Sequence, residues 1–134
     1  MKKLTATVAV LCLCLVPSLL QAATYDGSVP LLCAPTMVLE CENTGECQQR
    51  TVESTNIPPF VTINFAQKTI SDTNNSSRTS MIKHLERLDG HLIMQGGEHG
   101  RSWNMVITEE TGTLSASAVS EGIGFVIFGA CTPR

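Results

Sequence analysis

The chain has 134 residues, a net charge of −3 and no run of basic residues. This balance argues against nucleic acid and anionic lipid as partners, because both are bound through clustered lysines and arginines. The length allows one small domain with a modest core and is too short for two.

Residues 1–22 predict a cleaved signal peptide. Two lysines precede an apolar run from Leu4 to Leu20, and Ala22 and Ala23 supply small residues for cleavage. The run could nearly span a bilayer, so an uncleaved membrane anchor is the alternative. Pro17, near the end of the run, and the small residues just after it favour cleavage. We therefore expect residues 23–134 to form a single small β-domain, periplasmic or secreted, with no membrane anchor after cleavage.

Removing residues 1–22 also removes two cysteines and two lysines. The remaining chain has seven basic and twelve acidic residues, a net charge of −5. Its four cysteines predict two disulfides, since an exported domain of this size meets an oxidising environment. We favour one bond between Cys41 and Cys47, across a short turn, and a second between Cys33 and Cys131, joining the two ends of the domain. The crossed pairing, with Cys33 bonded to Cys47, stays open.

The mature sequence repeats short apolar runs separated by turn residues about every ten positions, a spacing typical of β-strands. Because the links are short, the pattern predicts an all-β fold. It would be an antiparallel meander of about eight strands that forms a small closed or nearly closed barrel. In chain order, the expected strands cover residues 37–41, 47–53, 61–65 with a return over 68–71, 79–88, 91–95, 103–108, 113–119 and 124–131.

Turn residues mark the links between these strands. Pro58 and Pro59 break regular structure, since proline cannot donate to a strand ladder. Residues 71–80 are almost wholly polar and predict an exposed loop, and Gly96 and Gly97, followed by a further glycine, predict another.

The Asp89-Gly90 pair predicts a two-residue hairpin turn, because both central positions of such a turn need positive φ. This turn favours a strand over residues 79–88. A helix over the same residues is the alternative, since their apolar side chains also fit a spacing of 3.6 residues. Those side chains are Met81, Ile82, Leu85 and Leu88.

Several local sequences are spread over most of the mature chain. They are Cys41-x5-Cys47, Asn56-Ile57-Pro58-Pro59-Phe60, Arg87-Leu88-Asp89-Gly90, Leu92-Ile93-Met94-Gln95-Gly96, Gly100-Arg101-Ser102-Trp103 and the ending Phe128-Gly129-Ala130-Cys131. Together they resemble a group of small exported proteobacterial proteins with no assigned activity. The resemblance implies export and a compact disulfide-bearing β-domain, and it implies no catalytic residue.

The residues that could take part in catalysis or bind a metal do not form a recognisable pattern. His84, His91 and His99 are separated by seven and eight residues, without the close ligand pairs typical of metal sites, so we expect no metal and no cofactor. A thiol nucleophile at Cys47 would need an unpaired cysteine, which the even count argues against. An envelope enzyme built on Cys47, His99 or Glu98 therefore remains an alternative only, and no catalytic residue is predicted.

The candidate binding surface is Glu98, His99, Arg101 and Trp103. Trp and Arg are enriched at binding hot spots, and function collects on loops that a rigid scaffold holds. Two interpretations of Trp103 stay open: it contacts a partner, or it closes one end of the barrel.

The leading functional hypothesis is a non-catalytic binding or inhibitory module. Its partner would be a protein or another cell-envelope component, and the acidic charge is compatible with a cationic one, such as a basic hydrolase of the lysozyme type. The alternative is a carrier that holds a small apolar ligand inside the barrel, since about eight strands can enclose one.

Overall fold

The structure is a computed structural model that describes residues 24–134, so the predicted signal peptide lies outside the described residues. These residues form ten β-strands and one short 3-10 helix, which confirms the all-β class. The elements are β1 (Leu31–Glu42), β2 (Cys47–Arg50), η1 (Glu53–Thr55), β3 (Val61–Asn64), β4 (Thr69–Asp72), β5 (Thr79–Met81), β6 (His84–Leu88), β7 (His91–Glu98), β8 (Arg101–Thr108), β9 (Thr113–Ser120) and β10 (Ile123–Pro133).

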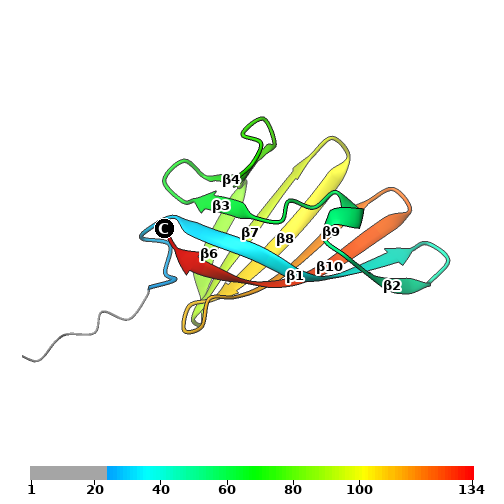
Figure 1. The fold of residues 1–134 in the computed structure, drawn as a ribbon. Coiled ribbons are helices and arrows are strands. Elements are labelled where there is room, and N and C mark those ends of the chain that lie inside the picture. The colour runs from blue at the N-terminus through cyan, green and yellow to red at the C-terminus, as the bar shows by residue number, and fades with distance from the viewer. Residues whose placement is uncertain (1–23) are drawn as a thin grey trace, which may run out of the picture.

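All strand pairs are antiparallel, and the strands form one sheet in the order β5-β4-β3-β1-β10-β9-β8-β7-β6, with β2 paired to β1 beside that path. The first and last long strands, β1 and β10, therefore lie side by side in the middle of the sheet (Figure 1). The sheet curls into a half-barrel, which confirms the predicted antiparallel barrel-like meander. Its two edge strands, β5 and β6, are consecutive in the chain, so the curl of the sheet brings its two edges close together at this point.

The strand predicted over residues 79–88 is divided into β5 and β6, and the helix alternative is wrong. At the division the chain changes its partner. Ile82 N donates to the carbonyl oxygen of Lys68 at 2.8 Å, on the β4 side. Lys83 N donates to the carbonyl oxygen of Gln95 at 2.9 Å, on the β7 side. Residues 79–88 thus supply both edge strands of the sheet, one paired with β4 and the other with β7.

Two further predicted boundaries were wrong. The strand expected over residues 47–53 ends at Arg50 and is followed by the helix η1. The first strand begins at Leu31, well before residue 37, because a β-bulge accommodates Pro35 within β1. Opposite the bulge, a Cβ on Gly129 would lie 2.3 Å from the carbonyl oxygen of Ala34, so only glycine allows β1 and β10 to approach this closely.

Both favoured disulfides are present. Cys33 bonds Cys131 and Cys41 bonds Cys47, and in each pair the two residues stand directly opposite on paired strands. The crossed pairing is therefore wrong. The Cys33–Cys131 bond ties β1 to β10 within the hydrophobic core, and the Cys41–Cys47 bond ties the edge strand β2 to β1.

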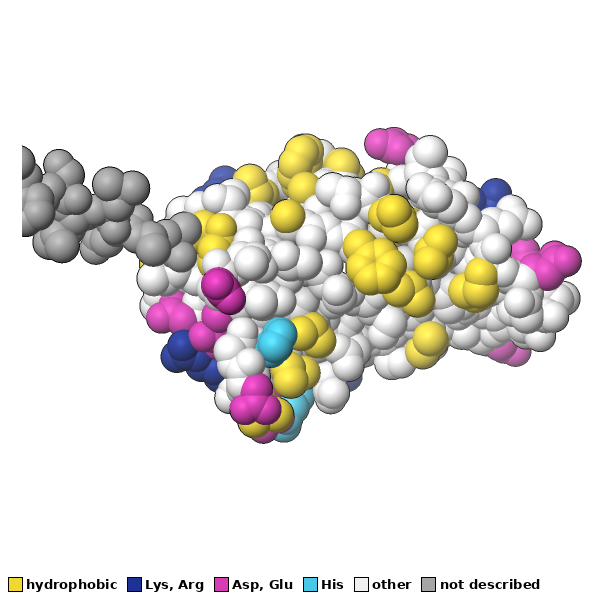
Figure 2. All heavy atoms as spheres, turned by 90° about the horizontal axis from the view of Figure 1, so that it is seen from below, with side chains coloured by type: hydrophobic (Ala, Val, Ile, Leu, Met, Phe, Trp, Pro, Cys, Tyr) yellow, Lys and Arg dark blue, Asp and Glu magenta, His cyan; other side chains and the backbone are white. Residues whose placement is uncertain are grey.

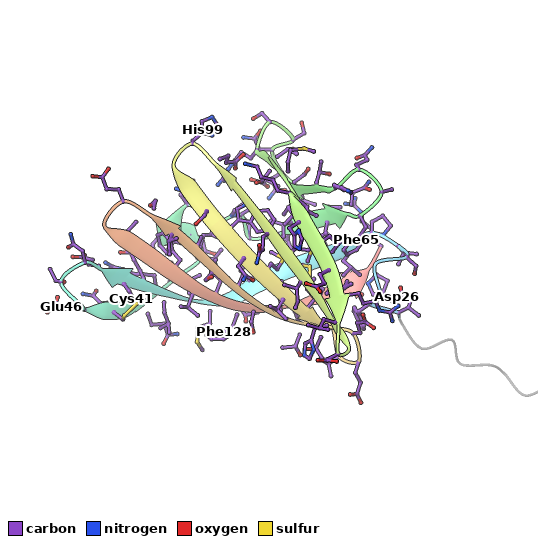
Figure 3. All side chains as sticks on the ribbon, turned by 180° about the vertical axis from the view of Figure 1, so that it is seen from behind. Asp26, Cys41, Glu46, Phe65, His99 and Phe128 are labelled. Carbon is purple, nitrogen blue, oxygen red and sulfur yellow. A yellow bond between two sulfur atoms is a disulfide. The ribbon has the colours of Figure 1, made fainter. Side chains whose placement is uncertain are left out.

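The core fills one end of the half-barrel. Tyr25 and Phe65 pack against the buried side chains at this end, and Gly112 leaves room for the Tyr25 ring, since a Cβ there would lie 2.4 Å from it. Figure 3 shows Phe65 and Asp26 far from His99, which lies at the opposite end. We call these the filled end and the open end. The largest fully buried side chains are Leu31, Cys33, Val38, Ile63, Met94, Ile107 and Leu114.

Local polar contacts fasten the chain at the filled end. The hydroxyl of Ser28 donates to Asp26 Oδ1 at 2.6 Å and its backbone N–H donates to the same oxygen at 3.0 Å, which lowers the pKa of Asp26. Arg87 forms a two-point ion pair with Glu109, and this partner raises the pKa of the guanidinium. The pair links β6 to the turn after β8.

Candidate functional site

The open end of the half-barrel holds a cleft of about 450 Å³ that is open to solvent. It lies between β3, β4 and β5 on one side and β7, β8, β9 and β10 on the other. This volume is in the range of small-molecule sites. The floor of the cleft is apolar and its rim is polar and charged. The floor residues are Val61, Ile70, Met105, Ala116, Ala118 and Ile127.

The hollow exists because inward-facing side chains shrink along β9. Leu114, near the filled end, is buried, whereas the next two inward positions toward the open end are Ala116 and Ala118. Ala116 stands opposite Met105 on β8 and Ile127 on β10, so its small side chain leaves the space between them unfilled. The sequence analysis missed these alanines, although two alanines in alternate positions of a predicted strand are a signal for a hollow.

Trp103 forms one wall of the cleft and is held in place from two sides. Its indole Nε1 donates to the hydroxyl of Ser80 on β5 at 2.9 Å. Its ring lies over Gly96, its direct partner on β7, where a Cβ would lie 2.3 Å from the ring and 2.6 Å from the carbonyl oxygen of Met81. Trp103 thus packs against the core and also lines the cleft at the open end of the half-barrel. That it contacts a partner stays a prediction.

The predicted loop at Gly96 and Gly97 was wrong, since both residues lie within β7. The turn consists of His99 and Gly100 alone, with φ of 49° and 74°. Positive φ at both positions is the geometry of a type I′ hairpin turn. Gly96 belongs to the strand through its pairing with Trp103, and the position is a glycine because the Trp103 ring occupies the space that a side chain would take.

The hairpin of β7 and β8 brings the four predicted residues to the cleft. Glu98 stands directly opposite Arg101, and Gly96 directly opposite Trp103, so both pairs lie on the inner face of the sheet. His99 lies at the tip of the hairpin (Figure 3). The cleft lining includes Glu98, His99, Arg101 and Trp103, so the structure places all four residues around one hollow.

A second charged wall, which the sequence analysis missed, faces this hairpin. Asp72 is 8% exposed and lies in β4, so the interpretation of residues 71–80 as a purely exposed loop was wrong. Arg78 Nη1 donates to Asp72 Oδ2 at 3.4 Å, and Arg78 Nη2 donates to the carbonyl oxygen of Asn56 at 2.6 Å. The backbone N–H of Asn74 donates to Asp72 Oδ1 at 2.8 Å. Short polar runs carry no periodicity, so nothing in the sequence indicated this burial.

Of the residues considered for catalysis or metal binding, Glu98 and His99 both line the cleft, whereas Cys47, His84 and His91 lie elsewhere. Cys47 is in a disulfide, and His84 and His91 lie at opposite ends of the β6–β7 pair. Within residues 24–134, no group of three or more His, Cys, Asp or Glu side chains is placed to hold a metal ion. The same residues contain no helix with the length and apolar character needed to cross a membrane.

The outer face of β1 and β10 carries a row of apolar side chains. Met37 stands opposite Phe128 and Leu39 opposite Val126, and Met37, Phe128 and Val126 are exposed. Figure 2 shows hydrophobic side chains gathered on this face. Figure 3 shows Phe128 pointing away from the interior of the half-barrel. This face and the cleft lie on opposite sides of the sheet.

Comparison of the chain with protein-family models, curated proteins and solved structures finds no match. The resemblance to small exported proteobacterial proteins therefore stays a prediction.

Proposed function

We propose that this chain is an exported, non-catalytic binding protein whose recognition site is the cleft at the open end. The observation that carries the proposal is the cleft itself, where an apolar floor adjoins a charged rim and where Trp103 is held rigidly. A fixed aromatic wall costs little conformational entropy on binding, which favours recognition. The ligand would place an apolar group on the floor and keep its polar part at the rim.

The second part of the proposal concerns the cellular compartment of the protein. The two disulfides indicate an oxidising, extracellular-type environment. Together with the signal-peptide pattern of residues 1–22, they support a periplasmic or secreted protein. An exported chain meets ligands from outside the cytoplasm, including envelope components and small molecules in transit.

The half-barrel favours a ligand that stays partly exposed. Large buried side chains occupy the filled end, so the space for a ligand is the cleft and not a closed interior. If the protein is a carrier, it would therefore bind its ligand in the cleft at the open end, and not inside a closed barrel. A binding or inhibitory module would use the same cleft for a side chain of a partner protein, with Trp103 and Arg101 as contact residues.

Substituting Ala116 by leucine is expected to weaken binding strongly, because the larger side chain fills the space between Met105 and Ile127. The probe is the neutral, apolar dye N-phenyl-1-naphthylamine, and the measurement is energy transfer to it from Trp103, the single tryptophan of the chain. We expect saturable one-to-one binding to the unmodified protein and an affinity at least about tenfold weaker for Ala116→Leu.

The matched control is Ala130→Leu, the same substitution at an exposed, outward-facing position of β10. This variant should bind the dye as the unmodified protein does. Equal loss of binding in both variants, or none in either, would refute the cleft as the site.

A further inference from the structure

Four charged side chains stand around the cleft, and their signs balance. Asp72 and Arg78 form one wall, and Glu98 and Arg101 lie at the tip of the facing hairpin. Asp72 and Arg78 are paired with each other, and Arg78 is also fixed by its bond to the carbonyl oxygen of Asn56. The charges of this wall are therefore compensated within the protein.

Glu98 and Arg101 differ from that pair. They face each other directly across β7 and β8 and both are exposed, yet within residues 24–134 neither has an ion-pair partner within 4.0 Å. Both also lie on the inner face of the sheet, in line with Gly96 and Trp103. The mouth of the cleft thus offers one carboxylate and one guanidinium to a bound molecule, directly next to the aromatic wall.

A head group with a single charge would be attracted by one of these side chains and repelled by the other. A head group with both charges satisfies the two side chains at once, and complementary placement of charge selects ligands in this way. We infer that the ligand of the cleft is a zwitterionic amphiphile. Its apolar part lies on the floor against Trp103, and its cationic and anionic groups meet Glu98 and Arg101. This inference rests on the proposed binding function.

The test compares three amphiphiles with the same octyl tail: octylphosphocholine, octyl sulfate and octyltrimethylammonium, each below its micelle concentration. Binding is followed by the fluorescence of Trp103. We expect octylphosphocholine to bind tightest, by about fivefold over each singly charged amphiphile, since exposed ion pairs are individually weak.

Two substitutions should change the order of affinity among the three amphiphiles in opposite directions. Glu98→Gln removes the carboxylate, so octyl sulfate should gain affinity. Arg101→Gln removes the guanidinium, so octyltrimethylammonium should gain. The matched controls, Glu110→Gln and Lys83→Gln, change the net charge by the same amounts at exposed positions outside the cleft lining and should leave the order unchanged.

The possible outcomes separate this inference from the proposed function. Equal affinity for all three amphiphiles, or tightest binding of octyltrimethylammonium as the net charge alone would give, overturns the inference and leaves the binding function standing. Failure of every amphiphile and of the neutral dye overturns both. The expected order with the opposite responses of the two variants supports both.

Discussion

Replacing Cys33 and Cys131 together by alanine should lower the free energy of unfolding by about 4–5 kcal/mol. The bond closes a loop with a sequence separation of 98 and lies in the hydrophobic core between the two central strands. Without it the unfolded chain regains much conformational freedom. Since small domains have about 5–15 kcal/mol of stability in total, the variant should be close to unfolding. Urea denaturation followed by circular dichroism measures the change.

The matched control replaces Cys41 and Cys47 by alanine. This bond closes a loop with a sequence separation of only 6, so its removal should cost about 2 kcal/mol and leave the remaining strands folded. A larger loss for the short loop than for the long one would contradict the account, because it would mean that the β1–β2 edge, and not the central pair of β1 and β10, holds the domain together.

Gly96→Val should lower the free energy of unfolding by about 1–3 kcal/mol and displace the Trp103 ring. A Cβ at this position would lie 2.3 Å from the ring and 2.6 Å from the carbonyl oxygen of Met81. The ring could move, but a backbone oxygen beside the division of β5 and β6 has little freedom to do so. Thermal unfolding and near-ultraviolet circular dichroism of Trp103 measure the two effects.

Gly124→Ala is the control for this substitution, because it also adds a side chain to a strand glycine. Its Cβ would meet Val119 at 3.6 Å, an ordinary van der Waals contact. Stability and the Trp103 signal should stay close to those of the unmodified protein. If Gly96→Val behaved like Gly124→Ala, the tryptophan would not be packed on β7 as described.

Local chemistry explains why much of the fold could be predicted from the sequence. The Asp89-Gly90 turn has positive φ at both residues, 49° and 76°, and joins β6 to β7 as expected. Two-residue turns depend on their own residues, so the sequence is sufficient for them. The favoured disulfide pairing is confirmed, because Cys33 and Cys131 lie near the two ends of the domain and these ends pair as β1 and β10. The sequence alone left the crossed pairing open.

Several of the wrong predictions involve contacts between paired strands, which residue type alone does not indicate. Gly96 and Gly97 have the composition of a loop, but they pair with β8, and the Trp103 ring across the strand pair explains why a glycine stands at position 96. The division of residues 79–88 arises because β4 and β7 compete for the same segment. The bulge that admits Pro35 depends on its partner strand β10.

Only part of the candidate site could be predicted, because its residues come partly from one short segment and partly from distant strands. Glu98, His99, Arg101 and Trp103 are close in sequence, so residue type alone could group them. The facing wall of Asp72 and the floor alanines come from other strands, which the curl of the sheet brings together. No local pattern places such residues in one cleft.

The most direct test of the cleft as recognition site is a map of backbone amide shifts in ¹⁵N-labelled protein as N-phenyl-1-naphthylamine is added. We expect the largest changes at residues that line the cleft, namely Ile70, Asp72, Trp103, Ala116 and Ala118. Changes centred instead on Met37, Val126 and Phe128, on the outer face of β1 and β10, would contradict the cleft as the site.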